Sequence, residues 1–343
     1  MITLDQIAQK CGVSKMTVSR ALGRDSHRVS PDKLKIILET ADKYNYRQNR
    51  LANSFNTGRT QLVAYLASEF RHFQSNVFAG VQAALVPQGY DILAMQWSQT
   101  LRKGDRLLES IVDRRVEGVM LFHQGPHCDY SYLEDLQKHG IPVVVVDRDV
   151  NVPDLGFVGL DNIGGSVEAT NHLLSLGHRN IAFISRDEDW GYSSTLERYK
   201  GYEMAMNEAG FSSLESIIIP EKDYKGNDAS SVAKEIQKMN VTAVICDNDV
   251  VAAFCILNLA DLGYSVPEQL SVVGFGNISG YVDLIRPKLT TVDLDPYKIG
   301  VEASGLLMDM ISVKYGEKQA ELLGDCRRIL PTELIVRDST YKL

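Results

Sequence analysis

Residues 4–22 read LDQIAQKCGVSKMTVSRAL, which contains two short amphipathic patterns separated by a glycine. Thr3 is a suitable N-cap for the first pattern, whose apolar residues recur at helical spacing. Gly12 predicts the end of that helix, and Ser14 is a suitable cap for a second helix over residues 16–22. Two short helices joined by such a turn are typical of a helix-turn-helix.

The second helix of this motif is expected to enter the major groove of DNA by its N-terminal part. Arg20 is then the best candidate for reading guanine, because its guanidinium matches two acceptors on that base. A third helix is expected over residues 32–44, after Ser30 and Pro31. A three-helix cap on an enzyme would give the same pattern. The residues of this module expected to contact DNA are Thr3, Ser14, Lys15, Met16, Thr17, Ser19, Arg20 and His27.

The charge is distributed unevenly along the chain. Residues 1–60 contain 11 Lys and Arg against 5 Asp and Glu, so they carry +6 while the whole chain carries −8. A basic module attached to an acidic body favours contact with nucleic acid phosphates. Short terminal segments also vary in charge by chance, so the net charge alone does not establish nucleic acid binding. The helical pattern of the segment has to decide it.

Composition excludes several classes of protein. With 343 residues, 44% hydrophobic and 23% charged, the chain is typical of a globular protein of two or three domains. No apolar run approaches 18 residues and the N-terminus lacks a signal-peptide pattern, so we expect a cytoplasmic protein without a membrane partner. The five cysteines are far apart and include no CxxC, which supports neither a disulfide framework nor a metal site.

The body alternates strand-like and helical patterns. Apolar runs are expected to form strands at 62–67, 91–95, 118–122, 143–147, 181–185, 216–219, 243–246 and 271–274. Helical stretches lie between or after them, at 76–88, 101–115, 163–176, 195–209, 228–239, 250–262 and 297–312. This order predicts parallel sheets in two doubly wound lobes, whose ligands bind at the carboxyl ends of the strands.

Motifs for catalysis are absent from the sequence. Gly274, Gly276 and Gly280 have the spacing GxGxxxG, which differs from the dinucleotide fingerprint GxGxxG. There is no GxxxxGK phosphate loop and no GxSxG elbow. His123 and His127 lack a second pair of metal ligands. We therefore expect no enzyme activity, no cofactor and no metal; a transport-type sugar-binding protein would not explain the basic N-terminal motif.

Residues 4–22, together with NRLANSFNTGRT at 49–60, resemble the LacI/GalR family of bacterial transcription regulators. The resemblance continues through IPVVVVDR at 141–148, GLDNIGGSVEATNHLLSLGHRNIAFI at 159–184 and LPTEL at 330–334, and so covers nearly the whole chain. It implies a small all-α helix-turn-helix headpiece plus an α/β body of two doubly wound lobes, similar to periplasmic binding proteins.

The resemblance also implies a domain organisation and a function. The implied boundaries are a headpiece at 1–47, a hinge at 48–59 and a body at 60–343, with an N-lobe at about 60–160 and 292–320 and a C-lobe at about 161–290 and 321–343. The implied function is a repressor of carbohydrate-related genes that binds pseudopalindromic double-stranded operator DNA as a homodimer. A small effector between the lobes controls it; a protein co-regulator or a non-sugar ligand is the alternative.

In the family the hinge forms a helix in the minor groove, where an apolar side chain enters a base step and kinks the DNA. Phe55 stands at the position of that side chain, and Gln48 replaces the usual proline before the hinge. The resemblance assigns DNA contacts in this segment to Asn49, Arg50, Ala52 and Phe55.

The resemblance places an effector site at the carboxyl ends of the strands. The candidate residues are Arg71, Phe73, Asp147, Asp161, Trp190, Arg198, Asn248, Asp249 and Gly276. Arg198 matches the family's effector-binding arginine, or it could form a salt bridge between lobes. Asn248 is preferred to Asp249, which could instead cap the next helix. Asp147 and Asp161 could bind hydroxyls or pair with arginines, and Trp190 could stack on a sugar or pack structurally.

One departure from the family lies after the strand at 271–274. The family has an aspartate there that holds the effector, whereas this chain has Phe275 and then Gly276. Loss of that carboxylate, together with Arg71, favours an anionic effector such as a sugar phosphate or a sugar acid. If Asp147 or Asp161 takes over its role, the effector is a neutral sugar. The sequence leaves both alternatives open, and also leaves open whether the effector releases or promotes DNA binding.

Overall fold

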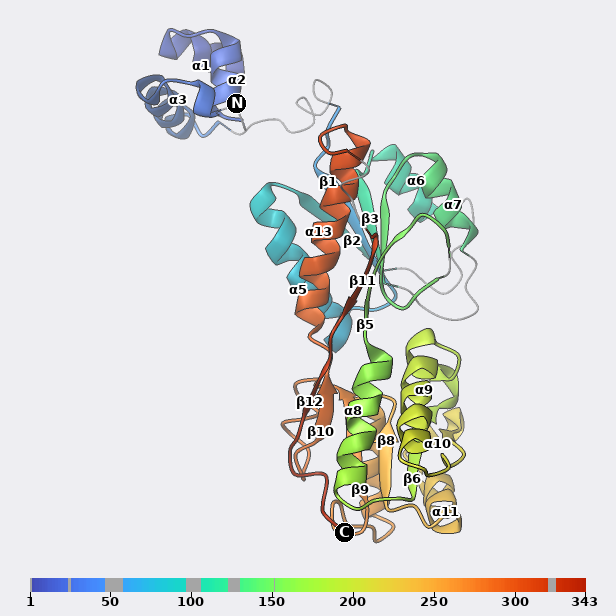
Figure 1. Cartoon of the computed structure of the whole chain (residues 1–343). Coiled ribbons are helices and arrows are strands. Elements are labelled where there is room, and N and C mark those ends of the chain that lie inside the picture. The colour runs from blue at the N-terminus through green and yellow to red at the C-terminus, as the bar shows by residue number, and fades with distance from the viewer. Residues whose placement is uncertain are drawn as a thin grey trace. The chain divides into compact units, whose positions relative to one another are not determined.

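The computed structural model describes residues 2–23, 26–46, 58–96, 106–122, 130–150, 152–319 and 325–343. The chain forms two compact units, Met1–Thr60 and Gln61–Leu343 (Figure 1). Among the described residues, no helix has the length and apolar character needed to cross a membrane.

The first unit is a three-helix headpiece built on α1 (Leu4–Cys11), α2 (Lys15–Ala21) and α3 (Pro31–Lys43), with a short 3-10 turn at Ser26–Arg28. Thr3 caps α1 in a capping box with Gln6, and Gly12 ends it with a left-handed φ of 62°. The core of the unit contains Ile7, Val18 and Ile37, which are fully buried. The predicted helix-turn-helix is confirmed.

The N-lobe has a six-stranded sheet in which every pairing is parallel, in the order β11-β5-β4-β3-β1-β2. Its strands are β1 (Leu62–Ala67), β2 (Asp91–Gln96), β3 (Gly118–Phe122), β4 (Val143–Asp147), β5 (Gly156–Leu160) and β11 (Arg327–Leu330). One face packs on α5 (His72–Leu85), continued by a 3-10 turn at Val86–Gln88, and on α13 (Pro296–Lys314). The other face packs on α6 (Arg106–Asp113) and α7 (Ser131–Lys138) (Figure 1).

The C-lobe has a second sheet in the order β12-β10-β9-β8-β6-β7, in which only the β10–β12 pairing is antiparallel among the described strands. Its strands are β6 (Ile181–Arg186), β7 (Ile217–Ile219), β8 (Ala243–Cys246), β9 (Ser271–Gly276), β10 (Thr290–Asp293) and β12 (Glu333–Ile335). On one face of this sheet lie α8 (Asn162–Ser175) and α9 (Ser193–Glu208). On the other lie α10 (Glu221–Lys225), α11 (Ser230–Lys238) and α12 (Asp249–Ala260).

The chain passes between the lobes three times. The first two passages follow β5 and β10, close to the predicted positions near 160 and 290. The third lies between Leu330 and Glu333 instead of near 320, because β11 pairs with β5 in the N-lobe sheet. The assignment of the whole of 321–343 to the C-lobe was therefore wrong for β11. Its residues alternate between exposed and half-buried at a sheet edge, so no apolar run marks the strand.

Candidate DNA-binding module and effector site

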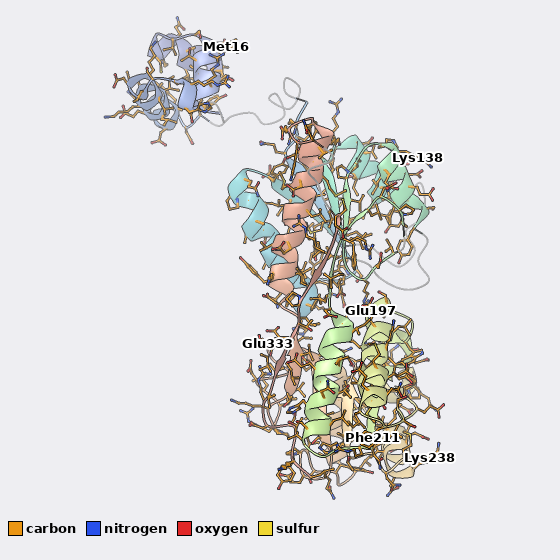
Figure 2. All side chains as sticks on the ribbon, in the orientation of Figure 1. Met16, Lys138, Glu197, Phe211, Lys238 and Glu333 are labelled. Atoms are coloured by element: carbon orange, nitrogen blue, oxygen red, sulfur yellow. The ribbon has the colours of Figure 1, made fainter. Side chains whose placement is uncertain are left out.

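The second helix of the headpiece presents a polar face to solvent. Val18 and Ala21 are buried, whereas Lys15, Met16 and Arg20 are exposed. The Met16 side chain is 62% exposed, and Figure 2 labels it on this unit. A large exposed apolar side chain among cationic ones suits the major groove, where a thymine methyl group accepts apolar contact.

Other headpiece candidates have local structural roles as well. The Ser14 hydroxyl accepts a hydrogen bond from the Thr17 N–H and lies 2.9 Å from the Thr17 hydroxyl. The Lys15 ammonium lies 2.8 Å from the Asp5 carboxylate in an exposed ion pair. Thr3 and His27 are exposed, and Ser19 is half-buried. The hinge candidates Asn49, Arg50, Ala52 and Phe55 lie outside the described residues.

In the second unit, a buried polar cluster lies at the carboxyl ends of β4 and β8. Asp147 ends β4 with a left-handed φ of 72°, and Asp247 follows β8 directly. Arg198 on α9 is only 7% exposed and donates to the Asp247 carbonyl oxygen at 2.6 Å. Its guanidinium also lies 4.8 Å from the centre of the Phe275 ring. The cluster lies at the carboxyl ends of the strands, the end at which parallel sheets generally present ligand-binding groups.

Three polar atoms of this cluster are buried and form no hydrogen bond within the described part of the chain: Asp147 Oδ1, Arg148 Nε and Asp247 Oδ1. The nearest charges are ion pairs at 3.6 Å, one between Arg148 and Asp147 and one between Arg198 and Asp247. Unpaired buried polar atoms are costly, so they mark a place where a ligand's own polar groups bind favourably.

The charges of the cluster are coupled between the lobes. Burial raises the pKa of Asp147, and the positive charges of Arg148 and Arg198 oppose that rise. Burial likewise raises the pKa of Asp247, which is opposed by Arg198 and by Arg148. Each carboxyl therefore senses an arginine of its own lobe and one of the other lobe. Both lobes therefore contribute charges to this cluster.

A short loop after β6 leads to Tyr192, which lies beside this cluster. After β6, Arg186 donates to both oxygens of Asp189, at 2.6 and 3.0 Å, across the 3-10 turn Asp187–Asp189. The turn leads to Tyr192, whose ring centre lies 3.6 Å from the Arg148 guanidinium carbon of the N-lobe. This cation–π contact connects the lobes directly beside the two carboxyls.

Asn248 caps the helix that Asp249 was expected to cap, and Asp249 is buried. Asn248, the preferred effector ligand, caps α12, because its side-chain oxygen accepts from the Val250 and Val251 N–H groups at 3.0 Å. Asp249 does not cap that helix. Its fully buried carboxylate accepts from the Ile278 N–H at 2.6 Å and from the Thr291 hydroxyl at 2.5 Å. Burial raises the pKa of Asp249 to about 6, although both hydrogen bonds oppose the rise.

The glycine at 276 is required by these contacts. Its φ is 130°, and a Cβ there would lie 3.0 Å from the Ile278 side chain and 3.2 Å from the Asp249 carboxylate. An aspartate at this position would be strained and would meet a second carboxylate. The departure from the family pattern therefore accompanies the inward position of Asp249.

The remaining candidates make structural contacts. Arg71 is 77% exposed at its side chain and pairs with Glu69 at 3.1 Å. Asp161 is exposed and caps α8 through the Gly164 N–H at 2.8 Å. Aromatic contacts join Phe73 to Phe122, with ring centres 5.9 Å apart, and Trp190 to Tyr199, 5.2 Å apart. For Trp190 this contact matches the structural alternative considered from the sequence, whereas the cap formed by Asp161 is neither of the two roles considered for it.

Comparisons with known proteins agree with this architecture. Residues 3–49 match the family described as bacterial regulatory proteins, lacI family, and residues 170–340 match a periplasmic binding protein-like domain. The transcriptional regulator DegA of Bacillus subtilis is 30% identical over 350 residues, covering 99% of this chain and 98% of DegA. The chain belongs to the LacI family.

Solved structures extend the likeness to the whole fold. A complex of the transcriptional regulator CelR with cellobiose is 26% identical with a TM-score of 0.70, over 99% of this chain and all of the other. A Lac repressor dimer bound to operator is 20% identical, with a TM-score of 0.77 and 99% coverage of both chains. As a LacI-family protein the chain is a DNA-binding transcription regulator and not an enzyme. The expected family and fold class are confirmed.

In this LacI-family chain the sequence did not single out Asp247, Asn162 or Glu197 as site residues, and it marked Arg148 only as the neighbour of Asp147 at a strand end. All four take part in the buried cluster. Arg148 and Asp247 stand beside predicted strand ends, which is a signal available in the sequence. Asn162 carries no such signal, since only packing of α8 against α9 brings it to Arg198, and Glu197, the neighbour of Arg198 in the chain, is marked only by its bond to Asn162.

Proposed function

We propose that the chain is a repressor whose DNA affinity is controlled by a neutral polyhydroxylated effector, a sugar, held between the two lobes. The observation that carries this proposal is the pair of buried carboxylate oxygens without hydrogen-bond partners, Asp147 Oδ1 and Asp247 Oδ1. They come from opposite lobes, and the charges of Arg148 and Arg198 act on both of them. Hydroxyl groups of one ligand that donate to both oxygens would hold the lobes in one arrangement.

A neutral ligand fits the charges of this cluster better than an anion. Arg148 and Arg198 already face Asp147 and Asp247 at 3.6 Å, so their positive charge is largely compensated. A phosphate would bring a further negative charge beside two desolvated carboxyls. A hydroxyl group would donate to a carboxylate and also accept from the Arg148 Nε–H. This reasoning favours a neutral sugar over the sugar phosphate or sugar acid that the sequence left open.

The relatives support a carbohydrate effector. CelR, which is similar over the full length of this chain, has been solved as a complex with cellobiose. The proposed polar ligands of the effector are Arg198 and Asp147, which the sequence suggested, together with Asp247 and Arg148.

A thermal-shift screen tests the effector class. The full chain is heated with neutral mono- and disaccharides, including ribose and cellobiose, and with sugar phosphates and sugar acids. We expect a neutral sugar to raise the melting temperature, and the rise to be lost in Asp147→Asn and Arg198→Ala. Arg71→Ala, which removes an exposed arginine paired with Glu69, is the matched control and should respond like the wild type. A response to sugar phosphates alone would contradict the proposal.

We further propose that a homodimer binds a pseudopalindromic operator. Two headpieces, each of +6 over residues 1–60, would supply phosphate attraction for two half-sites. Affinity for a duplex selected from a random library should fall steeply with salt. The expected stoichiometry is two chains for each duplex, measured by analytical ultracentrifugation. One chain for each duplex would contradict the dimer.

A further inference from the structure

The side chain of Asn162 bonds two consecutive residues of α9. Its Nδ2 donates to Glu197 Oε2 at 2.9 Å, and its Oδ1 accepts from Arg198 Nε at 2.9 Å. Asn162 is 1% exposed, so this amide is enclosed by protein and not by solvent. Both ends of the amide are therefore used, one by a carboxylate and one by a guanidinium.

These two bonds restrict the orientation of Arg198. The Nε–H is directed at Asn162, while Nη1 donates to the Asp247 carbonyl oxygen at 2.6 Å. With these donors fixed, the plane of the guanidinium is set above the Phe275 ring. An arginine side chain has many rotamers in solution, and fixing one of them in advance lowers the cost of binding a ligand.

Asn162 also lies where the chain enters the C-lobe from the N-lobe. It is the first residue of α8 and follows the passage from β5 of the N-lobe, which ends at Leu160. Glu197, labelled in Figure 2, lies on α9 at the end of the C-lobe where this passage enters. A change in the path of the passage would move the amide, and with it the guanidinium of Arg198.

We propose that Asn162 and Glu197 form a positioning pair that holds the Arg198 guanidinium for the effector. Glu197 fixes which way the Asn162 amide is turned, because a carboxylate accepts only from the amide nitrogen. The amide oxygen is then left to accept from Arg198. The inference rests on the proposed effector site, since it assigns to Arg198 a role in binding.

The proposal can be tested by exchanging the amide of Asn162 and the carboxylate of Glu197. Asn162→Asp places a carboxylate against Glu197, and repulsion between the two acceptors turns the introduced carboxylate out of the position in which it accepts from Arg198. Glu197→Gln alone leaves the amide free to turn. The double variant Asn162→Asp with Glu197→Gln restores a donor facing an acceptor, and the introduced carboxylate can still accept from Arg198. A purely steric role for Asn162 would not show this rescue.

The experiment measures the four proteins in two ways. Isothermal titration uses the neutral sugar that stabilises the wild type most in the screen above. Nitrogen-15 NMR follows the arginine Nε–H signal that disappears in Arg198→Lys, and this signal needs no sugar. Glu208→Gln, which changes an exposed charge at the end of the same helix, is the control. Circular dichroism and melting establish that each variant is folded, and Asn162→Ser serves if Asn162→Asp is not.

We expect Asn162→Asp to bind the sugar at least tenfold more weakly and to lose the slowly exchanging Arg198 signal. The double variant should return to within threefold of the wild type and regain that signal. If the double variant is as weak as Asn162→Asp and its signal stays lost, the positioning pair is refuted. If Arg198→Ala leaves sugar binding unchanged, the proposed effector site fails instead, and the NMR signal still decides whether the pair holds Arg198.

Discussion

The guanidinium carbon of Arg148 lies 3.6 Å from the centre of the Tyr192 ring, and the two residues belong to different lobes. Arg148 follows β4 of the N-lobe, and Tyr192 precedes α9 of the C-lobe. The contact adjoins the carboxyls that we propose as effector ligands. It gives the chain a connection between lobes that does not depend on a ligand.

Removing the Tyr192 ring should weaken effector binding. A cation–π contact contributes about 0.5–2 kcal/mol, so Tyr192→Ala should bind the neutral sugar roughly 2- to 30-fold more weakly. Tyr192→Phe keeps the ring and should retain most of the affinity, as measured by isothermal titration. Leu196→Ala, at an exposed position on the same helix, is the control. Equal losses in the Phe and Ala variants would show that the hydroxyl and not the ring matters.

The buried carboxyl of Asp249 should make stability depend on pH. Its pKa is raised to about 6 in the folded chain, so the folded state holds this proton more tightly than the unfolded state. Stability from this group is therefore present at low pH and lost as pH rises from about 4 to about 6. At roughly 1.4 kcal/mol per pH unit, the loss is about 3 kcal/mol.

Asp249→Asn cannot ionise and should lack this dependence. Urea unfolding at pH 4.5, 5.5 and 7 should show the variant gaining stability relative to the wild type as pH rises. Asp261→Asn, at the exposed end of the same helix, should show no such trend. A constant difference between Asp249→Asn and the wild type across this range would contradict the prediction.

Replacing Gly276 should destabilise the body. At a φ of 130°, with Ile278 at 3.0 Å and the Asp249 carboxylate at 3.2 Å from a new Cβ, alanine meets both backbone strain and crowding. Gly263 also has a positive φ, of 90°, but open space around its Cβ position. Chemical unfolding should therefore show a loss of about 1–3 kcal/mol for Gly276→Ala and a smaller one for Gly263→Ala. Equal losses would assign the effect to backbone strain alone.

Arg20→Ala should relax sequence choice as well as affinity. Arg20 is exposed on α2, and a bidentate contact with guanine discriminates by about 1–3 kcal/mol. Fluorescence anisotropy on the selected operator and on a random duplex should show the larger loss on the operator. Lys33→Ala, at an exposed lysine of α3, should weaken both duplexes similarly. A uniform loss for Arg20→Ala would make Arg20 a phosphate contact.

Local signals in the sequence predicted much of the fold. Thr3, Gly12 and Ser14 act within one turn of their own helices, so the helix-turn-helix could be read directly. Strands such as β4 are continuous apolar runs because parallel strands are buried on both faces. By contrast, β11 lies at a sheet edge, and β10 reads TTVD, so neither carries the apolar run that marks a central strand.

The site was predictable only in part. The sequence named Arg198 and Asp147, which lie in the buried cluster, through strand ends and a family pattern, but it did not anticipate that Asn248 caps α12 and that Asp249 is buried. Both residues suit a helix cap, and the choice depends on Ile278 and Thr291, which only the packing of β9 and β10 brings to Asp249.

The sequence alone therefore determined the family, the helix-turn-helix, the alternation of strands and helices in the body, and the basic character of the headpiece. These properties depend on periodicity, caps and charge, which act between residues near one another in the chain. Tertiary structure decided which groups meet: Arg148 with Tyr192, and Asn162 with Glu197 and Arg198. Those contacts join residues that are far apart in the chain, and their geometry is fixed only when two sheets and their covering helices have packed.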